Sequence, residues 1–107
     1  MIDPNKCIDF ILENAGKYAQ AKGELAQLEA YKSSLKAIKM AETSEQSLGA
    51  QEREAYRSQD YQDLCKAIGI ATEKAEKLKW QLEGARLRHA TWQTLEVSNR
   101  TQDRILK

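Results

Sequence analysis

The residues of this chain that could do chemistry are one histidine, two cysteines and 16 acidic residues. His89 is the only histidine, and the residues one helical turn away from it, such as Ala85 and Trp92, are not metal ligands. Cys7 and Cys65 are far apart in the sequence and follow no ligand spacing. A metal site needs ligands grouped at such spacings. We therefore expect neither a metal ion nor another cofactor.

Patterns of catalytic residues are also missing from the sequence. Carboxylates such as Glu73 and Glu76 stand beside lysines, as on a solvated helix surface, and none is isolated among apolar residues for acid–base work. Nothing pairs His89 with a cysteine nucleophile, and the chain has no glycine-rich phosphate loop. The sequence therefore predicts a protein that is not an enzyme.

The composition favours helix at nearly every position. Charged residues make up 31% of the 107 residues, the single proline is at position 4, and valine occurs once. Ala, Glu, Gln, Lys and Leu dominate, and all five are good helix formers. We expect one all-α domain over residues 1–107.

Apolar residues recur in steps of three and four along two long segments. Such a 3.5-residue repeat is typical of one helix lying along another. In the second segment we call this line the seam: Tyr61, Leu64, Ile68, Ala71, Ala75, Leu78, Leu82, Ala85, His89 and Trp92. In the first segment the predicted line is Ile8, Ile11, Ala15, Tyr18, Ala21, Leu25, Leu28, Tyr31, Leu35 and Ile38.

Capping and turn residues set the expected boundaries. The first helix is predicted at about 4–40, opened by Asp3 and Pro4, and a polar connection follows at 42–49. A short helix at about 50–57, a break near Ser58 and a long helix at about 59–98 follow. The polar tail at 99–107 either continues the long helix or is disordered. Two long helices with a short connection form a coiled-coil-like antiparallel hairpin.

Several large apolar residues lie off the seam and require a second packing surface. They are Ile70, Trp80, Leu87 and Leu95. Either the short helix folds back over them or a second copy of the chain covers them. We expect a homodimer that completes a bundle, because symmetric pairs are the commonest assemblies. Its predicted oligomer seam contains Leu78, Leu82, His89 and Trp92, with the polar His89 setting register or partner choice.

Charge is unevenly distributed although the formal net charge is only +1. Residues 42–76 hold eight acidic and four basic side chains, and residues 77–107 hold seven basic and three acidic ones. In that basic third, Lys77, Lys79, Arg100 and Arg104 are candidate nucleic-acid contacts, with tryptophans among them that could stack on bases. This pattern supports a single-stranded nucleic acid accessory as the alternative function.

The chain contains no segment that we expect to enter a membrane. Its N-terminus lacks a charged region followed by an apolar run, and no stretch approaches the ~20 apolar residues of a membrane span. Cys7 and Cys65 each stand among apolar helical positions, and we expect both to be reduced packing residues. We therefore expect a cytoplasmic protein without a membrane partner.

Several short segments of the second half form a further pattern: Glu52-Arg53-Glu54-Ala55-Tyr56, Asp60-Tyr61, Glu76-Lys77-Leu78-Lys79-Trp80-Gln81-Leu82, Trp92, Asn99-Arg100 and Asp103-Arg104. Through these segments the chain resembles a family of small helical proteins encoded by tailed phages and prophages. Ser58-Gln59-Asp60-Tyr61 stands where that family often has His-Pro-Glu-Tyr. Members are encoded near recombination genes and mostly lack an assigned activity. The resemblance implies a phage accessory protein inside a bacterial host cell and supplies no mechanism.

The leading functional hypothesis is therefore a non-enzymatic accessory protein that binds a bacterial or phage protein through a helical surface. It would act in phage recombination or in the inhibition of a host defence nuclease, as an inhibitor of the anti-CRISPR or anti-RecBCD type. The candidate contacts are Trp80, Leu87, Arg86 and Arg88, because Trp and Arg are enriched at binding hot spots.

Overall fold

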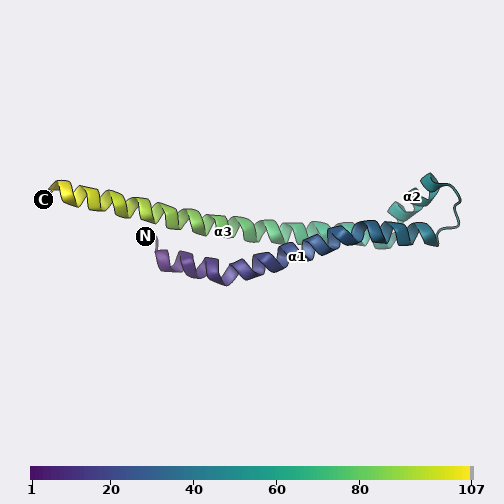
Figure 1. Cartoon of the computed structure of the whole chain (residues 1–107), viewed down its shortest axis with the longest axis horizontal. Helices are drawn as coiled ribbons and strands as arrows, with labels where there is room; N and C mark the ends of the chain where they lie inside the picture. Colours follow the sequence, from purple (N-terminus) through teal and green to yellow (C-terminus); the bar gives the residue numbers. More distant parts are fainter. Residues whose placement is uncertain (107) are drawn as a thin grey trace. The chain divides into compact units, whose positions relative to one another are not determined.

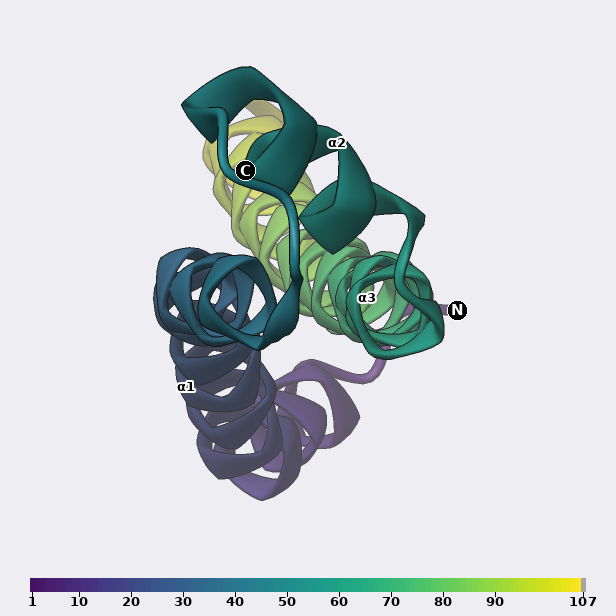
Figure 2. The same cartoon turned by 90° about the vertical axis from the view of Figure 1, so that its right-hand side faces the viewer.

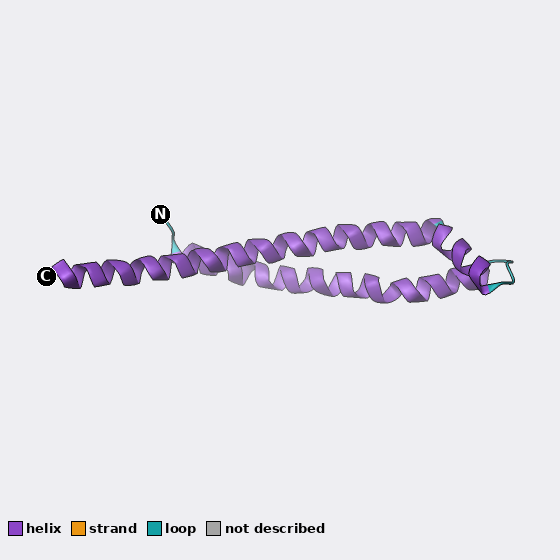
Figure 3. Ribbon diagram, turned by 90° about the horizontal axis from the view of Figure 1, so that it is seen from above, coloured by secondary structure: helices purple, strands orange, loops and turns teal. Residues whose placement is uncertain are grey.

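A computed structural model describes residues 1–106 of the chain as three helices, α1 (Pro4–Glu42), α2 (Leu48–Arg57) and α3 (Gln59–Leu106) (Figure 1). These residues include no strand (Figure 3), so the all-α class is confirmed. The contacts divide the chain into two compact units. The terminal unit comprises Met1–Ala19 and Glu76–Lys107, and the loop unit comprises Gln20–Ala75.

Asp3 and Pro4 start α1. The Asp3 carboxylate oxygen Oδ1 accepts hydrogen bonds from the backbone N–H of Asn5, at 2.9 Å, and of Lys6, at 3.4 Å. Pro4 is the first helical residue, where its missing N–H costs nothing. The helix continues two residues beyond the predicted end, to Glu42, whose carboxylate pairs with Lys39 at 3.0 Å.

The covered side of α1 matches the predicted apolar line only in part. Ile8, Ala15, Tyr31 and Ile38 of that line are exposed. Its other six residues are buried or half-buried, and the covered side also includes Cys7, Asn14 and Lys39. Polar side chains can occupy this side because Asn14 donates to the Phe10 carbonyl at 2.8 Å, and because the Lys39 stem packs while its ammonium reaches carboxylates.

The connection and the break at Ser58 are held by side-chain caps. Ser47 is the N-cap of α2, and its hydroxyl oxygen accepts from the Ala50 N–H at 3.2 Å. Ser58 separates α2 from α3 with an extended backbone. Its hydroxyl donates to the Ala55 carbonyl at 2.7 Å and accepts from the Tyr61 N–H at 3.3 Å. One serine therefore ends a helix and starts the next, close to where the sequence predicted a break.

Within the loop unit, α2 lies beside the end of α1 and the start of α3 (Figure 2). Ala55 lies on the covered side of α2 and is fully buried. The Tyr56 and Tyr61 rings meet edge to face, with centroids 5.2 Å apart. Lys36 of α1 pairs with Glu52 of α2 at 3.4 Å. These contacts attach α2 to both long helices.

Ion pairs also show that the long helices run in opposite directions within the loop unit. Lys39 pairs with Asp60 at 2.6 Å, and Glu24 pairs with Lys74 at 3.8 Å. The residue number rises along α3 as it falls along α1. This antiparallel pairing is described for the loop unit alone.

The seam of α3 is the covered side of that helix. All ten of its residues, from Tyr61 to Trp92, are buried or half-buried. Leu64 and Ala75 are the most deeply buried of them. The 3.5-residue repeat therefore identified the packed face of α3 correctly.

In the described part of the polar tail, residues 99–106, α3 continues as helix to Leu106, which is one of the two predicted alternatives. Segment 99–106 contains neither Gly nor Pro. Its polar residues bond back onto the helix: the Thr101 hydroxyl donates to the Val97 carbonyl at 3.0 Å. Arg104 lies in the last turn, where a cation complements the helix dipole.

Two glycines of α1 and the two cysteines differ in how closely other residues surround them. A Cβ added at Gly16 or Gly23 would meet no atom within 4 Å, so neither glycine permits a close approach inside the described chain. Both cysteines are free, but only Cys7 is buried and Cys65 is exposed. Cys65 is therefore not the packing residue that the sequence suggested.

Candidate protein-binding surface

Trp80 projects from α3 as an exposed side chain, with 63% of its surface accessible. Its indole N–H donates to the Glu76 carboxylate at 3.2 Å, one helical turn earlier. The Lys79 ammonium lies 5.4 Å from the ring centroid, within the range of a cation–π contact. The ring is thus held in place by its own helix while more than half of its surface stays accessible.

Leu87, two turns later, is also exposed, at 53%. Neighbouring Arg86 forms an ion pair with Glu83. The hydrogen bond in this pair raises the pKa of Arg86 and lowers the pKa of Glu83. Arg88 differs from Arg86, because it forms no ion pair with the described residues and lines an open hollow of about 320 Å³ with Cys7 and Phe10.

The four residues predicted for an oligomer seam lie on another side of α3. Leu78, Leu82, His89 and Trp92 are half-buried within the single chain. The His89 and Trp92 rings are 5.8 Å apart, centroid to centroid. Trp92 also lines a hollow with Met1, Ile2 and Leu95, so part of its cover comes from the start of the chain. Their role between copies of the chain stays a prediction.

The proposed nucleic-acid contacts Lys77, Lys79, Arg100 and Arg104 are all exposed. Arg100 and Arg104 line a small hollow together with Val97 and Thr101. Arg100 donates from Nε to the Glu96 carbonyl at 3.5 Å, and Arg104 has no ion pair among the described residues. Lys77 and Lys79 are two residues apart and so point to different sides of the helix. The four cations do not form one patch.

A regular apolar line that was not predicted from the sequence lies on the side of α3 roughly opposite the seam. Its members recur in steps of three and four, and all are exposed. We call this line the outer face: Leu87, Ala90, Thr94, Val97, Thr101 and Ile105. Trp80 lies two turns before Leu87 on the same side of the helix. The 3.5-residue spacing would have revealed it, had threonine been counted as a methyl-bearing residue.

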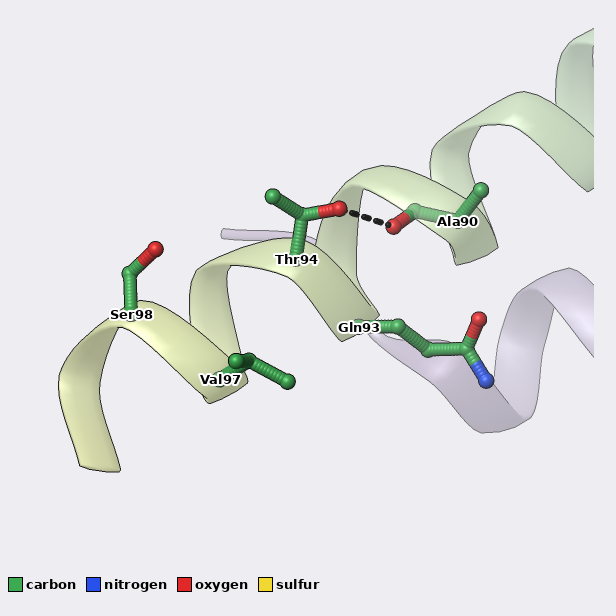
Figure 4. Close-up of a pocket in the computed structure, with 5 residues that line it drawn as sticks. All are labelled: Ala90, Gln93, Thr94, Val97 and Ser98. Atoms are coloured by element: carbon green, nitrogen blue, oxygen red, sulfur yellow. Dashed lines mark hydrogen bonds between the residues drawn. The ribbon is translucent and has the colours of Figure 1, made fainter. Parts of the chain in front are cut away.

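The threonines of the outer face have their hydroxyls turned inward. Thr94 donates to the Ala90 carbonyl at 3.1 Å, as Figure 4 shows, and Thr101 donates to the Val97 carbonyl. Ala90, Thr94 and Val97, together with Gln93 and Ser98, line an open hollow of about 390 Å³. The hydroxyl hydrogens are satisfied within the helix, which leaves the methyl groups to face outward.

Residues 1–106 offer neither a metal-binding cluster nor a membrane span. These residues contain no cluster of three His, Cys, Asp or Glu side chains that could hold a metal ion. None of the three helices there combines the length and apolar character needed to cross a bilayer.

Comparison with protein-family models, with curated proteins and with solved structures finds no match for this chain. Any functional argument therefore depends on the surface just described and on the sequence resemblance.

Proposed function

We propose that this chain is a non-enzymatic accessory protein that binds another protein through the exposed side of α3. The observation that carries the proposal is Trp80, an exposed aromatic residue held by Glu76 and Lys79 and aligned with the outer face. Tryptophan is the residue type most enriched at interface hot spots. Contiguous exposed apolar residues are typical of interaction surfaces.

The biological setting is proposed from the sequence resemblance. Segments 52–56 and 76–82 resemble small helical phage and prophage proteins. We therefore propose that the partner is a bacterial or phage protein in the cytoplasm of the host cell. The process would be phage recombination or the inhibition of a host defence nuclease.

Affinity capture with a matched pair of variants tests the proposal. The chain is immobilised and exposed to bacterial lysate, and the retained proteins are identified by mass spectrometry. Trp80→Ala should reduce capture of the partner by at least about tenfold, the effect of a hot-spot residue. Tyr31→Ala also removes an exposed aromatic side chain, from α1, and should leave capture unchanged. Equal capture by both variants, with unchanged helicity, would remove Trp80 from the interface.

Single-stranded nucleic acid binding is the second candidate function. The observation that favours it is the absence of an ion pair, among the described residues, at Lys77, Arg88, Arg100 and Arg104. Unpaired cations can hold phosphates, and such binding weakens steeply with salt. A gel-shift assay with a labelled oligonucleotide at low and high salt tests this alternative. Retention at low salt that is lost in Arg100→Ala/Arg104→Ala would support it.

We also propose that α1 and α3 pair as an antiparallel hairpin along both units, and that two chains associate. The opposed directions of the helices in the loop unit support the hairpin. The association is supported by Ile8, Leu12 and Ile38 of α1, which are exposed apolar residues that a second copy would cover. Light scattering at micromolar concentration should give the mass of a dimer, and a monomer mass would contradict the association.

A further inference from the structure

We infer that the outer face of α3 binds an amphipathic α-helix of a partner protein whose apolar side is edged by acidic residues. The inference rests on the proposed function and specifies the partner's chemistry. The face begins at Leu87 and ends at Ile105, which corresponds to about 28 Å of helix at 1.5 Å per residue. A partner helix of about 20 residues would cover it.

The outer face is apolar and accessible. Val97 and Ile105 are 57% and 77% exposed, and the stretch between Arg88 and Glu96 contains no Asp, Glu, Lys or Arg. Side chains at steps of three and four form the ridges and grooves into which another helix packs. Ala90 and the threonines are small enough to receive larger side chains from such a helix.

Covering this face would leave few polar groups unsatisfied. The hydroxyls of Thr91, Thr94 and Thr101 already donate to backbone carbonyls one turn earlier, at 2.9, 3.1 and 3.0 Å. Burying a hydroxyl without a partner is costly, and here each one brings its partner with it. The threonines therefore behave as apolar residues toward a binding helix.

Charge along one edge of the face determines the choice of partner. Arg86, Gln93 and Arg100 recur every seven residues along this edge, and Arg104 continues it. Arg100 and Arg104 form no ion pair with the described residues. The other edge carries the uncharged Thr91, Ser98 and Gln102. Glutamates on the partner would find unpaired guanidinium groups here.

A second copy of the same face is a poorer occupant. In an antiparallel pair related by a two-fold axis, each edge meets its own copy, which brings arginine against arginine. In a parallel pair the arginine edge meets the uncharged edge and gains nothing. An acidic helix gains on the arginine edge in either direction.

The experiment uses two dye-labelled synthetic helical peptides of about 20 residues with the same Leu/Ala apolar side. One peptide carries Glu at both edges and the other carries Lys. Fluorescence anisotropy with the full chain should show the Glu peptide binding at least about tenfold more tightly than the Lys peptide, with a difference that shrinks as salt rises.

Two matched pairs of variants locate the site. Val97→Glu should weaken binding of the Glu peptide at least about tenfold, whereas Ile70→Glu, at an equally exposed apolar position of the loop unit, should not. Arg100→Glu/Arg104→Glu should reverse the preference, so that the Lys peptide binds more tightly than the Glu peptide. Lys17→Glu/Lys66→Glu changes the net charge equally, off the face, and should keep the original preference.

Three results would overturn the inference. The first is equal binding of the two peptides. The second is conversion of a dimer to a monomer by Val97→Glu in light scattering, and the third is displacement of the Glu peptide by an oligonucleotide that binds the arginines. Failure of the peptide test with continued loss of lysate capture in Trp80→Ala would reject the acidic helix and leave the proposed function standing.

Discussion

The basic side chains of the loop unit and those of the C-terminal part of α3 differ in how many of them form ion pairs. In the loop unit, Lys36, Lys39 and Lys74 each reach a carboxylate on another helix. After Glu83–Arg86, by contrast, no ion pair joins the described residues of α3 to any other. The loop unit thus pairs many of its charges internally, while the C-terminal part leaves cations available to a partner.

Apolar residues show the same contrast. Leu64 of the loop unit is 8% exposed, whereas Leu87 and Val97 are more than half exposed. The start of the chain covers α3 as far as the hollow formed by Met1, Leu95 and Asn99. Beyond it, all described residues are exposed. One continuous helix is therefore packed along part of its length and exposed on every described side beyond Asn99.

The largest expected effect separates these two leucines. Leu64→Ala should lower the free energy of unfolding by about 2–3 kcal/mol, because it removes buried methyl groups and leaves a cavity. Leu87→Ala should change it by less than about 0.5 kcal/mol, as exposed substitutions do. Chemical denaturation followed by circular dichroism measures both. Similar losses from the two variants would mean that Leu87 is covered, for example by a second copy.

Ser58→Ala should have an intermediate effect. It removes a side chain that accepts from the Tyr61 N–H and donates to the Ala55 carbonyl. Loss of such a cap costs about 1 kcal/mol. Ser98→Ala is the control, because Ser98 is an exposed serine inside α3 and should have almost no effect. An unchanged denaturation midpoint in Ser58→Ala would indicate that α2 docks without the cap.

The smallest effect concerns alkaline pH in the loop unit. Hydrogen bonds to Asp60 and then Glu42 raise the pKa of Lys39 above its ordinary value of 10.5. A raised pKa stabilises the folded state fully below the ordinary value, and this stabilisation is lost as the pH rises through the folded pKa.

Denaturation midpoints between about pH 9 and 12 test this expectation. Lys39→Met should show a smaller alkaline loss of stability than the wild-type chain. Lys66→Met removes an exposed lysine that has no ion pair among the described residues, and should lose stability like the wild type. Identical curves for all three chains would show that the Lys39 pairs contribute nothing measurable, as is common for exposed ion pairs.

Much of the fold could be predicted from the residues, but the candidate site could be predicted only in part. The seam from Tyr61 to Trp92 follows from periodicity alone, because burying one face of a helix imposes that spacing. On α1 the same reasoning chose Ile8, Tyr31 and Ile38, which are exposed. It failed there because it ignored Asn14 and Lys39, whose polar ends are satisfied on the covered side. Trp80 and Leu87 were identified as off the seam, but the outer face that extends them was not.

By itself, the sequence determined that the chain is helical, where α3 packs, and that some apolar residues must lie off the packed face. Helix propensity and a 3.5-residue repeat are local properties, so the residue order contains them. Only the tertiary structure decided which apolar residues stay exposed and which cations stay unpaired. Those outcomes depend on which residues of another segment lie opposite, and on where the covering segment ends. On α3 the covering segment ends near Leu95 and Asn99, and the outer face lies on the side of the helix that the seam leaves exposed.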